Sequence, residues 1–173
     1  MQYLYSLIKI NSLVSALLVV TIAPSMFTSG ALEPGLASAQ EVIQFSKLNI
    51  AIETETGSHQ FTVEIAETER QLARGLMGRQ SLAVDAGMLF IYSRPRRAAM
   101  WMKDTLLPLD MLFVGEDGTI INIIERTMPM SLATLRSINP VRAVLEVNAG
   151  TVARLGIKPG NRVVHNKLFS SYQ

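Results

Sequence analysis

A short segment near the middle of the chain concentrates the side chains that could do chemistry. It holds the single tryptophan, with a lysine, a threonine and two aspartates among apolar neighbours: Trp101, Lys103, Asp104, Thr105 and Asp110. An indole beside an ammonium group and a hydroxyl can bind a sugar, a peptide or a small anion. We therefore predict a ligand-binding site built from these residues, joined by Arg79 and Glu146 from elsewhere in the chain.

The same segment also has a structural explanation. If it is a strand, Trp101, Lys103 and Thr105 share one face. Trp101 would then belong to the core, and Lys103 would pair with a carboxylate such as Glu146. Thr105 or Asp110 would hold backbone groups that the next bend leaves unpaired. The sequence leaves both interpretations open.

Patterns typical of catalytic sites are weaker. The histidines, His59 and His165, fall in a predicted hairpin turn and near the C-terminus, so neither indicates a nucleophile with its base. A carboxylate pair drawn from Asp104, Asp110 and Glu146 could supply an acid and a base. Their spacing in the sequence does not establish how far apart they lie.

The sequence also contains few motifs that could bind a metal or a cofactor. The absence of cysteine removes disulfides, thiolate metal sites and thiol nucleophiles. Glu116 and Asp117 are too few carboxylates for an oxygen-only calcium loop. The methionines suit irregular core packing better than a copper(I) site. We predict no metal and no cofactor.

The first residues of the chain have the character of a signal peptide. Lys9 precedes an apolar run from Leu13 to Ala23, which is shorter than the roughly 20 residues that cross a bilayer. The small residues of Ala37-Ser38-Ala39 suit a signal peptidase. We predict that residues 1–39 are removed and that the mature protein is periplasmic or secreted. The alternative is an anchor formed by an uncleaved N-terminal segment.

The mature part, residues 40–173, is long enough for a single domain, with its core at about 47–166. The net charge is +2, and the basic residues are scattered except for Arg94, Arg96 and Arg97. We therefore predict no nucleic-acid partner and, after cleavage, no membrane association. The expected partner is a small molecule or an envelope protein.

Alternation of apolar and polar residues predicts strands through most of the mature part. Asp117-Gly118 predicts a tight hairpin, and Gly57-Ser58 predicts another. The less regular segment 127–140 is predicted to be a surface loop. The predicted strands cover residues 48–52, 61–65, 87–92, 100–102, 111–114, 120–124, 141–147 and 162–165.

Two short helices complete the prediction. Thr68-Glu69-Arg70-Gln71 has the spacing of a capping box. Asn148 or Thr151 can cap a second helix that Gly156 ends, and Lys158-Pro159-Gly160-Asn161 fits a type II turn. The predicted fold class is α+β: a single compact domain with a mostly antiparallel curled sheet, or a small β-barrel, and two short helices.

Several ordered motifs resemble those of one family. The resemblance runs from Phe61 to Val164 and is to the exported bacterial family catalogued as domain of unknown function 192. The motifs are Gly75-Leu76-Met77-Gly78-Arg79, Gly87-Met88-Leu89-Phe90, Trp101-Met102-Lys103-Asp104-Thr105, Pro108-Leu109-Asp110, Leu145-Glu146-Val147, Ala149-Gly150 and the turn from Gly156-Ile157 to Gly160.

The resemblance implies a compact, strand-rich α+β fold, often behind a signal peptide, and no established activity. The chain has Asp104 where the family usually has Asn, and Asn161 where many members have Asp. The first difference alters any ligand contact at that position, because a carboxylate accepts hydrogen bonds and an amide also donates them.

These observations favour a noncatalytic exported module that binds a small molecule or a protein. One alternative is a carboxylate-dependent hydrolase or other enzyme, which requires two carboxylates to converge in a cleft and one to have a perturbed pKa. Another is a purely structural interaction domain of the cell envelope, which requires an exposed apolar patch.

Overall fold

The computed structural model describes residues 42–165 and residue 168, so the predicted signal peptide lies outside the described residues. This part of the chain consists mostly of strands, with two short helices between them, which confirms the α+β prediction. None of its helices is long and apolar enough to cross a membrane. The elements are β1 Ser46–Thr54, β2 Gly57–Ala66, α1 Glu69–Arg74, β3 Ala86–Arg96, β4 Ala99–Met100, β5 Leu109–Val114, β6 Ile120–Ile124, β7 Leu135–Arg136, β8 Val141–Asn148, α2 Thr151–Leu155 and β9 Arg162–Val164.

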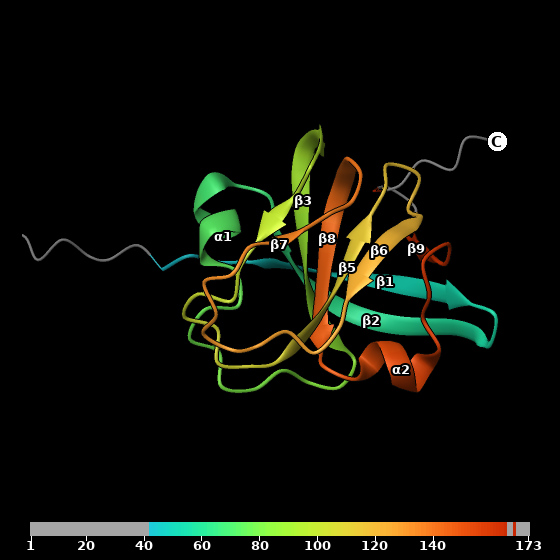
Figure 1. The fold of residues 1–173 in the computed structure, drawn as a ribbon, viewed down its shortest axis with the longest axis horizontal. Coiled ribbons are helices and arrows are strands. Elements are labelled where there is room, and N and C mark those ends of the chain that lie inside the picture. The colour runs from blue at the N-terminus through green and yellow to red at the C-terminus, as the bar shows by residue number, and fades with distance from the viewer. Residues whose placement is uncertain (1–41, 166–167, 169–173) are drawn as a thin grey trace, which may run out of the picture. The chain divides into compact units, whose positions relative to one another are not determined.

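The main sheet has seven strands in the order β6-β5-β8-β3-β2-β1-β9. All neighbours are antiparallel except β2 and β3, which are parallel and are joined by the crossover that contains α1. The sheet curls, and the two helices lie at different ends of it (Figure 1). Strands β4 and β7 form a separate pair.

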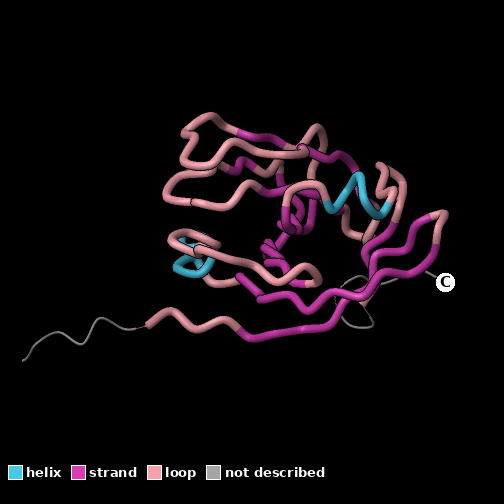
Figure 2. Tube along the Cα trace, turned by 90° about the horizontal axis from the view of Figure 1, so that it is seen from below, coloured by secondary structure: helices cyan, strands magenta, loops and turns pink. Residues whose placement is uncertain are grey.

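The two edges of the curled sheet meet at the turn between β5 and β6. The Val163 amide of β9 donates to the Gly118 carbonyl at 2.8 Å, and Thr119 forms an isolated bridge with Arg162. The tube along the chain shows how the strands wind around a common interior (Figure 2). The result is a half-barrel in which β9, at one edge of the sheet, is hydrogen-bonded to the β5–β6 turn at the other edge. This contact protects part of the exposed sheet edges.

The central strands β3, β5 and β8 are buried on both faces. Successive side chains of a strand point to opposite faces, so Leu89 and Leu145 join a cluster inside the curl. Met88 and Val144 join a second cluster on the outer face. Every residue of β5 is buried. This second cluster is the layer in which the candidate site lies.

Helix α1 begins as the capping box predicts. The Thr68 hydroxyl accepts from the Gln71 amide at 3.3 Å, and the Gln71 side chain accepts from the Thr68 amide at 3.0 Å. The helix ends at Gly75, whose φ is 47°. A β-carbon at Gly75 would lie 3.0 Å from Cζ of Phe90. The glycine therefore allows the end of α1 to pack directly on β3.

Helix α2 starts in a way that local sequence does not show. Neither Asn148 nor Thr151 caps it: the N-cap is Gly150, with a φ of 85° and no side-chain bond. Asp110, far away in the sequence, accepts the Val152 amide at 2.9 Å and so supplies the cap from β5. The predicted end at Gly156 is confirmed, with a φ of 65°.

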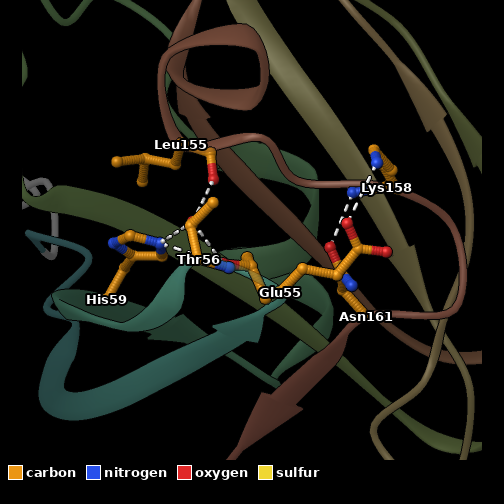
Figure 3. Close-up of polar contacts among 7 residues, drawn as sticks. Glu55, Thr56, His59, Leu155, Lys158 and Asn161 are labelled. Atoms are coloured by element: carbon orange, nitrogen blue, oxygen red, sulfur yellow. Dashed lines mark hydrogen bonds and ion pairs between the residues drawn. The ribbon is translucent and has the colours of Figure 1, made fainter.

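The tip of the β1–β2 hairpin holds α2 and the turn after it (Figure 3). The hydroxyl of Thr56 donates to the carbonyl of Leu155 at 3.3 Å, and Lys158 pairs with Glu55 at 3.2 Å. The turn precedes Gly57 rather than lying at Gly57-Ser58.

His59 consequently lies in strand β2, whereas the sequence predicts it in a turn. The hydroxyl of Thr56 lies 3.4 Å from Nε2 of this histidine (Figure 3). The hydroxyl of Thr54 lies 3.1 Å from the same nitrogen. The imidazole therefore joins the polar contacts at the tip of the hairpin.

The predicted strand at residues 100–102 is wrong beyond its first residue. Strand β4 ends at Met100, and the chain then forms a loop up to Pro108. Thr105 is buried while Trp101 and Lys103 are exposed, although these three side chains would share one face of a strand. The alternation of apolar and polar residues does not predict the structure here, because only Ala99 and Met100 pair with β7 and the chain bends after them.

The segment 127–140, predicted to be a loop, contains β7 and otherwise lacks regular structure. It runs beside the loop that follows β4. The Met102 amide donates to the carbonyl of Ser131, and the Met130 amide donates to that of Thr105, both at 3.0 Å. These backbone bonds fix the loop after β4 from its outer side.

Candidate ligand-binding site

A small pocket opens between α1, β3, β8 and the loop after β4. Its volume is about 70 Å³, which is room for a few water molecules or the end of a small ligand. Side chains from all of these elements line it, including Leu72, Leu76, Met77, Phe90, Met100 and Trp101. Most of the lining residues are therefore apolar or aromatic, and Arg74, Thr105 and Glu146 add polar groups, as is usual for small-molecule sites.

Glu146 is the buried carboxyl group of this pocket. It is 4 % exposed and lies on β8, directly between Met88 of β3 and Met111 of β5. Within the described residues, no hydrogen bond or ion pair to its carboxyl group is present. Burial raises the pKa of Glu146 from 4.5 to about 8. The pocket thus contains a carboxyl group that carries a proton at neutral pH.

Tyr92 stands close to this carboxyl group on the same face of the sheet. Its hydroxyl donates to the sulfur of Met100 at 3.4 Å, and the guanidinium of Arg96 lies 5.0 Å from its ring centre. Burial raises the pKa of Tyr92 to about 12, with Arg96 acting in the opposite direction and Glu146 adding to the rise. The phenol therefore stays neutral, and its hydrogen bond holds the side chain of Met100, which lines the pocket.

Trp101 forms part of the rim of the pocket and is 51 % exposed. The ammonium of Lys103 lies 5.5 Å from the centre of the indole ring, a cation–π distance. Both observations contradict the structural interpretation of the sequence, in which Trp101 is core and Lys103 pairs with Glu146. The reason is that the loop turns these side chains outward instead of continuing a strand.

Thr105 is buried, and it also lines the pocket. Its hydroxyl donates to the carbonyl of Lys103 at 3.1 Å, and its amide donates to the carbonyl of Met102 at the same distance. Because its proton is committed to the backbone, the lone pairs of this hydroxyl are left to accept.

Asp104 and Arg79 lie outside the pocket lining. Asp104 is exposed with a positive φ of 53°, and its carbonyl accepts from the Gly78 amide at 2.8 Å, which ties the loop after β4 to the loop after α1. Arg79 forms an ion pair with Glu64 of β2. Both residues hold the neighbouring loops.

Asp110 lies on the opposite face of the sheet from Glu146. It is completely buried and pairs in register with Val147, which belongs to the cluster inside the curl. Its carboxylate accepts the amides of Arg126 and Val152, each at 2.9 Å. Asp110 therefore connects β5 to the loop after β6 and to α2.

The structure thus brings together three of the predicted residues, Trp101, Thr105 and Glu146, around one pocket. It adds residues that were not predicted as site residues, above all Arg74 in the last turn of α1 and Met77 just after it. A short helix with an apolar face indicates packing, so nothing in the sequence distinguished the side of α1 that borders a cavity.

The described residues hold no group of three or more histidine, aspartate and glutamate side chains that could bind a metal ion. A family model for domain of unknown function 192, described as "Uncharacterized ACR", matches residues 51–165. The chain belongs to this family. A search of the curated proteins found no match.

Two solved structures are similar to this member of the family. A protein of Sinorhizobium meliloti 1021, described as a candidate transcription regulator, is 47% identical, with a TM-score of 0.69, and the match covers 71% of this chain and 96% of that one. A protein of unknown function from Novosphingobium aromaticivorans DSM 12444 is 36% identical, with a TM-score of 0.68, over 76% and 99% of the two chains.

Proposed function

We propose that this protein is an exported, noncatalytic module that binds a small molecule in the pocket of Glu146. The observation that carries the proposal is a buried carboxyl group, without a partner in the described residues, in the wall of a cavity that is lined mostly by apolar residues and rimmed by an exposed tryptophan. Burial of an unpaired polar group destabilises a fold. A ligand that supplies the missing partner would remove this cost, which favours binding as the role of the site.

The loops around the pocket support the same role. The described residues with positive φ other than glycine are Asp104, Arg126 and Met130. Each lies in the loop after β4 or in the neighbouring loop after β6, where a hydrogen bond of its main chain, to another backbone group or to the carboxylate of Asp110, holds it in place. Backbone strain of this kind concentrates at binding sites because the surrounding structure must hold it.

The enzyme alternative has a weaker basis. It requires two of Asp104, Asp110 and Glu146 to converge. Asp110 is bonded to two backbone amides on the other face of the sheet, and Asp104 is exposed outside the pocket lining. Glu146 would have to act with a group other than these carboxylates.

A protein partner is a second candidate, favoured by exposed apolar side chains next to the pocket. Leu106 follows Trp101 in the same loop, and the neighbouring segment adds four more exposed residues: Met128, Met130, Leu132 and Ile138. Adjacent exposed apolar side chains are typical of interaction surfaces. Under this proposal an envelope protein would cover these two loops.

The export proposal rests on the sequence of the N-terminal segment. The apolar run and the Ala37-Ser38-Ala39 site support cleavage and a periplasmic or secreted location. N-terminal sequencing of the protein recovered from its native host would test it. A first residue at Gln40 is the expected result, and an intact N-terminus would favour the anchored alternative.

A ligand screen tests the binding proposal. The full-length protein is mixed with amines, amino acids, sugars, nucleotides and peptidoglycan fragments, and melting temperature and Trp101 fluorescence are recorded. We expect one class to raise the melting temperature and to change the emission of this single tryptophan. Glu146→Gln should abolish both responses, whereas Arg154→Gln, in the last turn of α2, should keep them. A ligand that acts equally on both variants would contradict the proposal.

A further inference from the structure

The inner wall of the pocket presents hydrogen-bond acceptors and electron-rich faces. Phe90 and Trp101 contribute aromatic rings, and Met77 and Met100 contribute thioethers, which accept weakly. The hydroxyl of Thr105 has its proton bound to the carbonyl of Lys103, so it offers lone pairs. Such a lining complements a group that donates hydrogen bonds and carries positive charge.

Glu146 makes this preference specific. Its carboxyl group is the buried titratable group of the pocket lining, and it has no partner in the described part of the chain. An ammonium group entering the cavity would favour the ionised form of this carboxyl group, with aromatic rings and a hydroxyl acceptor beside it. At this inner wall, a carbonyl or phosphate group would meet only the proton of the neutral carboxyl group.

The exposed side of the pocket has the opposite charge. Arg74 lines the pocket from the last turn of α1 and is exposed, and no ion pair with this guanidinium exists within residues 42–165 and 168. Lys103 stands over the indole at the rim. Both groups would repel a ligand that is only cationic, and Arg74 is able to bind a carboxylate through two parallel hydrogen bonds.

We propose that the pocket binds a small amphoteric molecule of the α-amino acid class, with its ammonium group on Glu146 and its carboxylate on Arg74. This proposal rests on the proposed binding function and names its ligand class. The volume of about 70 Å³ favours molecules with very short side chains. The probes are therefore glycine, L-alanine and L-serine, with ethylamine and propionate as partial ligands that lack one charge each.

Binding is linked to the ionisation of Glu146. Besides Arg74, several charged or titratable groups lie on the side of the sheet that Glu146 faces. Tyr92 and Arg96 are on β3, and Lys103 and Asp104 are in the loop after β4. The Glu64–Arg79 pair lies beyond Met88. Burial raises the pKa of Glu146 to about 8. An ammonium ligand binds the ionised form, so its affinity should rise about tenfold per pH unit up to about pH 8 and then level off.

The experiment is titration calorimetry of the full-length protein at pH 6, 7 and 8. L-alanine should bind at least tenfold more tightly than ethylamine or propionate, with affinity that increases with pH. Arg74→Gln should reduce alanine affinity to that of ethylamine, whereas the matched Arg154→Gln in the last turn of α2 should leave it unchanged. Glu146→Gln should remove both the binding and its pH dependence.

Other outcomes would overturn the amino-acid class. Ethylamine binding as tightly as alanine would make the ligand a simple cation. Propionate binding that weakens as pH rises would show that the neutral carboxyl group donates to an anion. If the amino acids fail while the wider screen finds another ligand that depends on Glu146, the binding function stands and this ligand class is wrong. If no compound binds in either experiment, the binding function fails as well.

Discussion

At the scale of single residues, the two buried carboxyl groups of the sheet have contrasting environments. Asp110 accepts two backbone amides, while Glu146 faces apolar side chains in a cavity. They lie on neighbouring strands but on opposite faces of the sheet. One group stabilises the backbone, and the other destabilises the fold unless it is protonated or bound.

The first prediction concerns the pH dependence of stability. Folded Glu146 keeps its proton up to about pH 8, whereas the unfolded group loses it near pH 4.5. The folded state therefore binds more protons between these values, and stability from this group falls as pH rises through them. The loss is at most about 1.4 kcal/mol per pH unit.

Denaturant unfolding from pH 4 to 9 measures this effect. The free energy of unfolding of Glu146→Gln should rise relative to that of the unmodified protein as pH increases from 4.5 to 8, and the difference should then level off. Glu53→Gln, at an exposed position of β1, serves as the control. Curves that stay parallel for Glu146→Gln would show that this carboxyl group has an ordinary pKa.

The second prediction concerns Asp110. Its replacement by alanine leaves the buried amide of Val152 and that of Arg126 without their acceptor. The cost in the free energy of unfolding should be about 2–4 kcal/mol. The comparison is Asp117→Ala in the exposed β5–β6 turn, whose carboxylate accepts from the Thr119 amide at 3.0 Å and which should cost about 1 kcal/mol or less.

Ligand binding separates the two possible roles of Asp110. If the residue is structural, the folded fraction of Asp110→Ala should keep the affinity of the unmodified protein for any ligand of the pocket. A loss of affinity without a loss of stability would place Asp110 in the binding site instead.

At the scale of elements, the end of α1 and the loop after β4 shape the pocket. The sharp turn at Gly75 brings Leu76 and Met77 over β3, and the bond from the Gly78 amide to the Asp104 carbonyl ties this turn to the loop. The pocket therefore lies where two irregular segments meet over a rigid sheet. This arrangement is common for binding sites.

A substitution at Gly75 tests this packing. Alanine there would have its β-carbon 3.0 Å from Cζ of Phe90 and would keep a φ of 47°, which is unfavourable for any L-residue with a side chain. We expect a loss of about 2–4 kcal/mol in the free energy of unfolding. Gly156→Ala, in the left-handed helical conformation with a φ of 65° and a ψ of 31° and with open space around it, should cost only about 1–2 kcal/mol. A loss at Gly75 no larger than the loss at Gly156 would contradict the expected strain at Gly75, where ψ is −141° and Phe90 is close.

At the scale of the whole domain, the contact of β9 with the β5–β6 turn closes the curl. The amides of Val163 and Ile120 donate across this contact at 2.8 Å, to the carbonyls of Gly118 and Asn161. Both residues are also in the interior cluster. The closure therefore joins elements from the middle and the end of the chain into one cooperative unit.

Hydrogen exchange measures whether the closure belongs to the global fold. The Val163 and Ile120 amides should exchange only through global unfolding, with protection that follows the free energy of unfolding in denaturant. The Thr119 amide, which bonds to the carboxylate of Asp117 within the exposed turn, is the internal control and should exchange much faster. Exchange of the Val163 amide at the rate of Thr119 would show that β9 opens independently.

Local patterns predicted the regular elements well because their causes are local. The capping box at Thr68, the Asp117-Gly118 hairpin and the end of α2 at Gly156 are all confirmed. The type II turn at Gly160 is confirmed by its φ of 93° and by the bond from the Asn161 amide to the Lys158 carbonyl. Each depends on the backbone preferences of a few adjacent residues.

The loop after β4 could not be predicted in this way. Its path depends on backbone bonds to Ser131 and Gly78, which are distant in the sequence. The cap of α2 by Asp110 is equally distant, and only the sheet places the two together. The sequence could therefore indicate that Trp101, Thr105 and Glu146 are unusual, but it could not show which of the nearby polar residues share a pocket with them.

The sequence by itself determined most of the strands, the presence of the two helices and the family, because alternation, caps and turn residues act over a few positions and the family motifs occur in order. The tertiary structure alone decided which face of the sheet each carboxyl group occupies relative to the helices and loops. That division follows from the physics of a buried sheet: adjacent residues point to opposite faces, and long-range packing determines whether an acidic group meets backbone amides, as Asp110 does, or an apolar cavity, as Glu146 does.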